Sequence, residues 1–207
     1  MHIRLLRILI VVTLLIFNFQ SLTKADDIKE FEIEGMSIGD SLLDFYSKEE
    51  INKAKKSKFY QLYPENKFAH IGFTKKNNDE YDAIVFVIKP NDNNYEIYSI
   101  AGRIAFRNNI EACKKKMSSI YNDVSKIITN KNNIIKSDGP HFEDTSGKSM
   151  TYGFTFYLKR GAIDLYCADW SREFETKKEY VDQLNLTIHS KEMSDYLTTQ
   201  HQKRNNR

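Results

Sequence analysis

The sequence predicts an α+β domain in which helices pack on an antiparallel sheet of about six strands. Six segments are rich in β-branched and aromatic residues, and most neighbouring segments are separated by short polar turns. Short turns favour antiparallel pairing, because parallel neighbours need long crossover connections. Amphipathic segments precede, separate and follow the two groups of three strands, which gives the order α-βββ-α-βββ-α. We expect a single domain over residues 26–198 and a disordered polar and basic tail at 199–207.

The first half begins with a helical stretch over residues 40–56, in which Ser47 and Glu50 fit a capping box. Turns rich in Asn and Asp then separate three β-branched runs, a pattern typical of hairpins. The three expected strands are 67–74, 81–89 and 95–106. In the last of them Gly102 interrupts an apolar face, which indicates a bulge or a close backbone approach.

The second half opens with the strongest helix signal, from the N-cap Asn109 to about Thr129. Its apolar residues recur in steps of three and four, so they share one face. We expect residues 130–150 to form a polar loop and a charged loop to precede the last strand. The three remaining expected strands are 151–158, 162–170 and 181–189, and Ser190 then caps a short helix that ends near Leu197.

The first 25 residues have the three zones of a secretory signal peptide. Arg4 and Arg7 precede the apolar run 8–17, and small residues at Thr23 and Ala25 fit a cleavage site between Ala25 and Asp26. The alternative is an uncleaved anchor, but a bilayer span needs about 20 predominantly apolar residues. We therefore expect an exported protein, most simply periplasmic, with no transmembrane span after cleavage.

Charge and composition limit the classes of partner. Loss of residues 1–25 removes three of the 31 basic residues and none of the 28 acidic ones, so the mature chain is formally neutral. A neutral domain gives no support for nucleic-acid binding, which needs an excess of Lys and Arg. The histidines are scattered without the spacing of a metal site. We expect no nucleic-acid partner, no metal and no cofactor.

The two cysteines fall on apolar faces of two expected elements. Cys113 lies in the apolar stripe of the long helix, and Cys167 alternates with Ile163 and Leu165 in a strand. Both side chains should therefore point into the same helix–sheet interface. An even number of cysteines in an exported chain favours a disulfide, and two cysteines allow only one pairing. The alternative is two buried thiols that do not meet.

The string Gly39-Asp40-Ser41-Leu42 resembles the signature of the GDSL-type esterases, whose serine is the nucleophile. The resemblance implies Ser41 as nucleophile, with Asp138 and His141 matching the family's Asp-x-x-His pair. The surroundings argue against it, because the preceding segment is too polar for a buried strand and the chain lacks the βαβ alternation of a parallel hydrolase sheet. The simpler interpretation is that Asp40 or Ser41 caps the following helix.

The run Ile38-Gly-Asp-Ser-Leu-Leu-Asp-Phe, after an acidic lead, resembles small exported proteins of AT-rich marine bacteria. That family has no assigned activity or catalytic residues, so the resemblance implies only an exported protein. The sequence shows no complete catalytic set. We therefore expect a non-catalytic binding or interaction module of the cell envelope, with an envelope protein or a small ligand as partner. The alternative is a GDSL-like hydrolase that uses Ser41 and His141.

Overall fold

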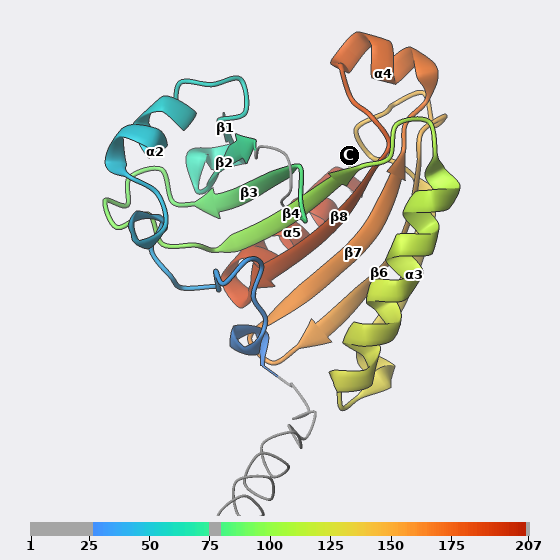
Figure 1. Cartoon of the computed structure of the whole chain (residues 1–207), viewed down its shortest axis with the longest axis horizontal. Coiled ribbons are helices and arrows are strands. Elements are labelled where there is room, and N and C mark those ends of the chain that lie inside the picture. The colour runs from blue at the N-terminus through green and yellow to red at the C-terminus, as the bar shows by residue number, and fades with distance from the viewer. Residues whose placement is uncertain (1–26, 75–79, 206–207) are drawn as a thin grey trace, which may run out of the picture.

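The computed structural model describes residues 27–74 and 80–205 and shows an α+β fold built on one antiparallel sheet (Figure 1). The predicted fold class is confirmed. Within the described residues the sheet has eight strands, in the order β1-β2-β3-β4-β8-β7-β6-β5, so the expectation of about six strands was too low. The predicted signal peptide and its cleavage site between Ala25 and Asp26 lie outside the described residues.

Two meanders form this sheet, and the pairing of β4 with β8 joins them. In each meander, consecutive strands pair with antiparallel neighbours. The β4–β8 pairing is also antiparallel and runs from Ser99 opposite His189 to Ala105 opposite Gln183. The strands are β1 (Gln61–Leu62), β2 (Ala69–Thr74), β3 (Ala83–Ile88), β4 (Ser99–Ala105), β5 (Ile134–Pro140), β6 (Met150–Leu158), β7 (Gly161–Asp169) and β8 (Gln183–Ser190).

The two strands that the sequence did not predict are the two edge strands. β1 is only two residues long. β5 lies within the stretch 130–150 that was expected to be a loop, and it pairs with β6 along its whole length. Most of its residues are exposed, and its second half is polar with Gly139 and Pro140. An edge strand with one neighbour has no need of a continuous apolar pattern, and Pro is tolerated there.

The helices begin at the predicted caps but extend over different lengths. Ser47 and Glu50 form the capping box of α2 (Lys48–Ala54), and Asn109 accepts a hydrogen bond from Ala112 N at the start of α3 (Ile110–Ile127). The charged loop expected before the last strand contains α4 (Arg172–Lys178). α5 (Lys191–Asn205) continues well beyond Leu197, so most of the expected disordered tail is helical. Lys203 forms an ion pair with Glu65 at 2.8 Å that attaches this last part to the fold.

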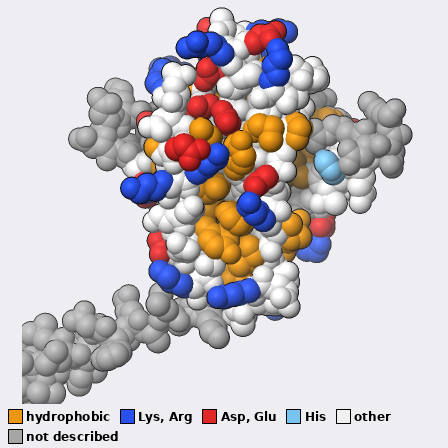
Figure 2. All heavy atoms as spheres, turned by 90° about the vertical axis from the view of Figure 1, so that its right-hand side faces the viewer, with side chains coloured by type: hydrophobic (Ala, Val, Ile, Leu, Met, Phe, Trp, Pro, Cys, Tyr) orange, Lys and Arg blue, Asp and Glu red, His pale blue; other side chains and the backbone are white. Residues whose placement is uncertain are grey.

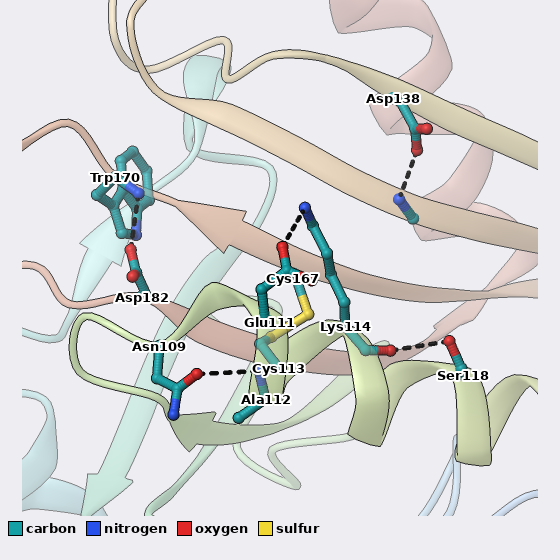
Figure 3. The surroundings of a disulfide bond; sticks show 11 residues. Asn109, Glu111, Ala112, Cys113, Lys114, Ser118, Asp138, Cys167, Trp170 and Asp182 are labelled. Carbon is teal, nitrogen blue, oxygen red and sulfur yellow. Dashed lines mark hydrogen bonds and ion pairs between the residues drawn. A yellow bond between two sulfur atoms is a disulfide. The ribbon is translucent and has the colours of Figure 1, made fainter.

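The larger apolar core lies between one face of the sheet and α3, α2 and the N-terminal segment that crosses the same face (Figure 1). The disulfide between Cys113 and Cys167 links α3 to β7 in this layer, with the two Cα atoms 6.1 Å apart. Both cysteines are fully buried. Figure 3 shows the bond beside the start of α3, where Asn109 caps the helix. The predicted pairing is confirmed.

α5 packs on the opposite face of the sheet, behind the strands in Figure 1. It contributes Met193 and Tyr196 to a smaller apolar cluster with Phe68 and with Val87 of β3. The Tyr196 hydroxyl also donates a hydrogen bond to the Pro64 carbonyl at 2.9 Å. This helix covers only part of its face of the sheet (Figure 1).

Charged side chains of both signs are interspersed around an apolar band on the side that carries α3 and β6 (Figure 2). On α3 itself, Lys114 pairs with Glu111 and Lys126 pairs with Asp123, each at 3.1 Å. This side of the protein therefore presents no uniformly basic surface. None of the described helices is long and apolar enough to cross a membrane.

Gly102 in β4 is required by a close side-chain approach. A Cβ atom at this position would lie 2.3 Å from the Tyr81 ring. Tyr81 is itself buried in the larger core, so the ring has little room to withdraw. The group that approaches Gly102 is thus an aromatic side chain and not the backbone that the sequence led us to expect.

We expect replacement of both cysteines by alanine to lower the free energy of unfolding by about 4 kcal/mol. The disulfide restricts the unfolded chain by linking two residues 54 positions apart. Without it the unfolded chain regains that conformational entropy, so unfolding becomes more favourable. Urea denaturation of the wild type and of the Cys113→Ala/Cys167→Ala variant measures it, and the wild type with its disulfide reduced is the control. A change below about 1 kcal/mol would contradict a stabilising role.

We expect Gly102→Ala to destabilise the fold by about 1–3 kcal/mol, because the added methyl group overpacks the core at Tyr81. Gly139→Ala is the matched control, since a Cβ atom there meets nothing within 4 Å. Thermal and urea denaturation of both variants give the comparison. Equal stabilities for the two variants would show that Tyr81 moves aside without cost.

Candidate functional site: a polar cleft on the sheet

Polar side chains occupy the sheet face opposite α3. In β8, Leu184 and Ile188 belong to the larger core, so the alternate residues point to the other face. In β7, Ile163 and Leu165 belong to the same core, and their neighbours likewise point away from it. The polar residues placed on the opposite face by these two strands are Asp164, Tyr166, Asn185, Thr187 and His189.

These side chains form the floor of a cavity of about 750 Å³. We call it the polar cleft and define its polar lining as Tyr63, His70, Ser99, Arg103, Ser137, Asp138, His141, Thr151, Thr155, Tyr157, Asp164, Tyr166, Asn185, Thr187, His189, Thr198 and His201. Leu197 and Thr198 of α5 form part of one wall, and Pro140 and His141 after β5 form part of another. The cleft is therefore the part of this face that α5 leaves uncovered.

The loop after β5 is held in place by one buried carboxylate, Asp144. Its oxygens accept hydrogen bonds from the hydroxyls of Ser146 at 2.6 Å, Ser149 at 2.5 Å and Ser171 at 3.1 Å. The bonds from Ser146 and Ser149 hold the pKa of Asp144 well below its usual range. The His141 ring also packs on Trp170, with the centroids 4.1 Å apart. This rim of the cleft is therefore anchored to the start of β6 and to the segment that follows β7.

A chain of three polar side chains crosses the floor from β6 to β8. The Thr155 hydroxyl donates to Asp164 Oδ1 at 2.6 Å, and His189 Nε2 lies 3.2 Å from Asp164 Oδ2. Burial raises the pKa of Asp164, but the hydrogen bond and charge of His189, with the Thr155 bond, bring it below the usual value. Asp164 is therefore ionised at neutral pH. On the other side of the ring, His189 Nδ1 is buried and meets no partner in the described part of the chain.

A second group lies one step along the same strands. Arg103 of β4 is opposite Asn185 of β8, which is opposite Tyr166 of β7. Arg103 Nε and Asn185 Nδ2 are buried and have no hydrogen-bond partner among residues 27–74 and 80–205. Asn185 is only 1 % exposed. Buried polar atoms are nearly always hydrogen-bonded in native proteins, so these two atoms indicate a position for a further group.

The charge of Arg103 acts on other residues of the cleft. Burial, with the positive charge of Arg103, lowers the pKa of His70 to about 4. Burial raises the pKa of Tyr63 to about 12 and also raises that of Tyr166, and Arg103 opposes both changes. His70 and both tyrosines are therefore neutral at pH 7. Apart from the histidines, the charged side chains that line the cleft are those of Arg103, Asp138 and Asp164.

A serine and a histidine are neighbours on the cleft floor. Ser99 of β4 lies opposite His189 of β8, so both side chains leave the same face as neighbours. A serine nucleophile would need a hydrogen bond to its base. No such bond joins Ser99 to His189 in the structure described here. Nor do the described residues contain a group of three or more His, Cys, Asp or Glu side chains that could hold a metal ion.

Of the three residues suggested by the esterase resemblance, Asp138 and His141 line the polar cleft, but Ser41 lies outside it. The Ser41 hydroxyl accepts a hydrogen bond from Leu43 N and donates one to the Asn94 carbonyl, and it caps the short helix Leu42–Asp44. Ser41 also bridges Glu96, just before the start of β4. His141 follows the end of β5, which runs in the same direction as β4 at the sheet edge. The serine and the histidine thus lie at opposite ends of the strands and several strands apart.

Asp138 is engaged elsewhere as well. Its carboxylate forms an ion pair with Lys136 at 2.7 Å and accepts a hydrogen bond from Gly153 N at 3.3 Å. The Lys136 pair holds its pKa below the usual value. The capping role that the sequence suggested for Ser41 is what the structure shows.

Asp138 and His141 of the cleft lining were singled out from the sequence, as partners of Ser41 in the esterase resemblance, whereas Arg103, Asp164 and Asn185 were not. The available signal was the polar half of each alternating strand, such as Asn185, Thr187 and His189 in β8. The alternation identifies the apolar face of each strand, but the sequence alone does not show what lies over its polar positions. Only the pairing of β4 with β8 brings Arg103 beside Asn185.

We expect the His70 ring to stay neutral until pH is near 4, because burial and Arg103 lower its pKa to about 4. The unfolded chain binds this proton below about pH 6.5 and the folded chain does not, so stability falls as pH drops from 6.5 toward 4. The loss is on the order of 3 kcal/mol at most. Ring NMR titration of His70 checks the pKa, and His70→Gln should weaken the acid dependence of unfolding. A His70 pKa near 6.5 would contradict this account.

Comparison of the chain with known protein families, with curated proteins and with solved structures found no match.

Proposed function

We propose that this protein is an exported, non-catalytic binding module of the cell envelope, most simply periplasmic, and that the polar cleft is its binding site for a small molecule. The observation that carries the proposal is the cleft itself. It is a cavity of about 750 Å³ on the sheet, lined by both apolar and polar side chains. Ligand sites typically have this size and combine an apolar lining with a few placed polar groups.

The buried atoms without partners support a ligand more than a purely structural role. Arg103 Nε, Asn185 Nδ2 and His189 Nδ1 all belong to cleft residues and lack a hydrogen-bond partner in the described chain. Leaving such groups unpaired costs about 1–3 kcal/mol each. A bound molecule that pairs with them recovers part of this cost. Because they come from strands rather than loops, the site is formed before the ligand arrives.

Two further observations support export. The disulfide between Cys113 and Cys167 is a feature of oxidising compartments. The N-terminal residues have the composition of a signal peptide. The proposal of a periplasmic address rests on these two features together.

We expect Ala101→Trp to abolish small-molecule binding while leaving the fold intact. Ala101 lies on the cleft floor in β4, where an indole would occupy the cavity. Ser119→Trp is the matched control, because Ser119 is exposed on α3, on the opposite side of the sheet. Saturation-transfer NMR with a fragment library measures binding to wild type and to both variants.

Fragments that bind wild type and Ser119→Trp but not Ala101→Trp would place the site in the cleft. Equal binding by all three proteins would place it elsewhere and overturn the proposal. If no fragment binds and in-cell crosslinking of the tagged protein captures an envelope protein through other surfaces, the module binds a macromolecule and the cleft is not its site.

A further inference from the structure

The polar cleft contains a guanidinium without a counter-ion. Arg103 lines the cleft from β4, and none of the described acidic residues forms an ion pair with it. Its influence on the pKa values of His70, Tyr63 and Tyr166 shows that its charge lies among these residues, which come from separate parts of the fold. A partly buried arginine without a partner is costly, because its desolvation is not compensated.

Neither of the two acidic residues that line the cleft pairs with Arg103, and Asp138 pairs with Lys136 instead. Asp164 is held by Thr155 on one side and by His189 on the other, and these two residues account for the lowering of its pKa. Glu143, in the rim loop, is exposed and raises the pKa of Tyr166 by its charge, but it forms no ion pair with Arg103 within the described residues. Within the described residues, therefore, no ion pair compensates the guanidinium of Arg103.

Hydrogen-bond donors surround the same position. The buried Asn185 amide, directly opposite Arg103, has an unpartnered Nδ2. Tyr166, the next residue across the sheet, remains protonated at neutral pH because burial raises its pKa. A guanidinium is a planar set of donors that matches a carboxylate in two parallel hydrogen bonds. An amide N–H and a phenol next to it add donors for the same oxygens.

The floor beside this position is apolar. Val85 and Val87 of β3 and Ala101 of β4 line the cleft next to Arg103, and Leu197 of α5 lines it from above. These side chains offer no hydrogen bonds and suit a hydrocarbon body. The cleft therefore combines one anion-binding end with an apolar surface.

We propose that the polar cleft binds a small organic carboxylic acid, with its carboxylate at Arg103 and Asn185 and its apolar body over Val85, Val87 and Ala101. This inference rests on the proposed function and adds the chemical class of the ligand. The Thr155–Asp164–His189 chain lies at the other side of the floor and presents a hydrogen-bonding surface to the far end of the same molecule.

The test compares carboxylic acids with their own primary amides. Benzoate, 2-naphthoate and octanoate, each beside its amide, are titrated into the full mature chain and followed by calorimetry and by NMR. We expect at least one acid to bind about tenfold or more tightly than its amide, because hydrogen bonds to a charged group are worth more than neutral ones. The side-chain amide signals of Asn185 should shift with the acid.

Arg103→Gln should remove the preference for the acid, and Arg107→Gln should keep it, since Arg107 is exposed and lies outside the cleft. If Arg103→Gln does not fold, the comparison of acid with amide on the wild type and the shift of the Asn185 signals still decide. Acids and amides that bind equally, with no effect of Arg103→Gln, would overturn the carboxylate assignment and leave the cleft as a binding site. If Ala101→Trp also leaves all binding unchanged, the proposed function fails with it.

Discussion

The antiparallel pairing of β4 with β8 is the contact on which the rest of the structure depends. It joins two meanders into one sheet and places the last strand of each at the centre, where both faces are covered or lined by side chains. Because strand residues alternate between faces, this single register fixes which residues meet on both sides. A slip of one position would move the cleft residues into the apolar core.

The two faces of the central strands have different roles. Leu184 and Ile188 of β8 and Leu165 of β7 pack against α3, where the disulfide ties the helix to the sheet. Their sequence neighbours carry the polar cleft on the other face. The face packed against α3 thus supports the polar cleft on the other face. The cleft residues come from strands that cannot move independently. Such a preformed floor loses little entropy when a ligand binds.

Burial and charge together define the chemistry of the cleft. Asp164 is stabilised by its neighbours, whereas Arg103 and Asn185 keep buried nitrogen atoms without partners in the described chain. Native proteins rarely leave such atoms unpaired unless a ligand, an ion or water uses them. Ser41, by contrast, has all the marks of a structural residue, because its hydroxyl is engaged by two backbone groups. The unpartnered nitrogen atoms of Arg103 and Asn185, unlike the engaged hydroxyl of Ser41, make the cleft the candidate functional site.

Local patterns in the sequence determined the elements whose causes are local. Asn109 and the Ser47–Glu50 pair began helices as predicted, and the apolar periodicities around Cys113 and Cys167 were enough to predict the disulfide. The tertiary structure alone decided that residues 134–140 form the edge strand β5, because an edge strand needs a neighbour more than an apolar pattern. It also decided the cleft, since Arg103 and Asn185 are far apart in the chain and become neighbours only when β4 pairs with β8.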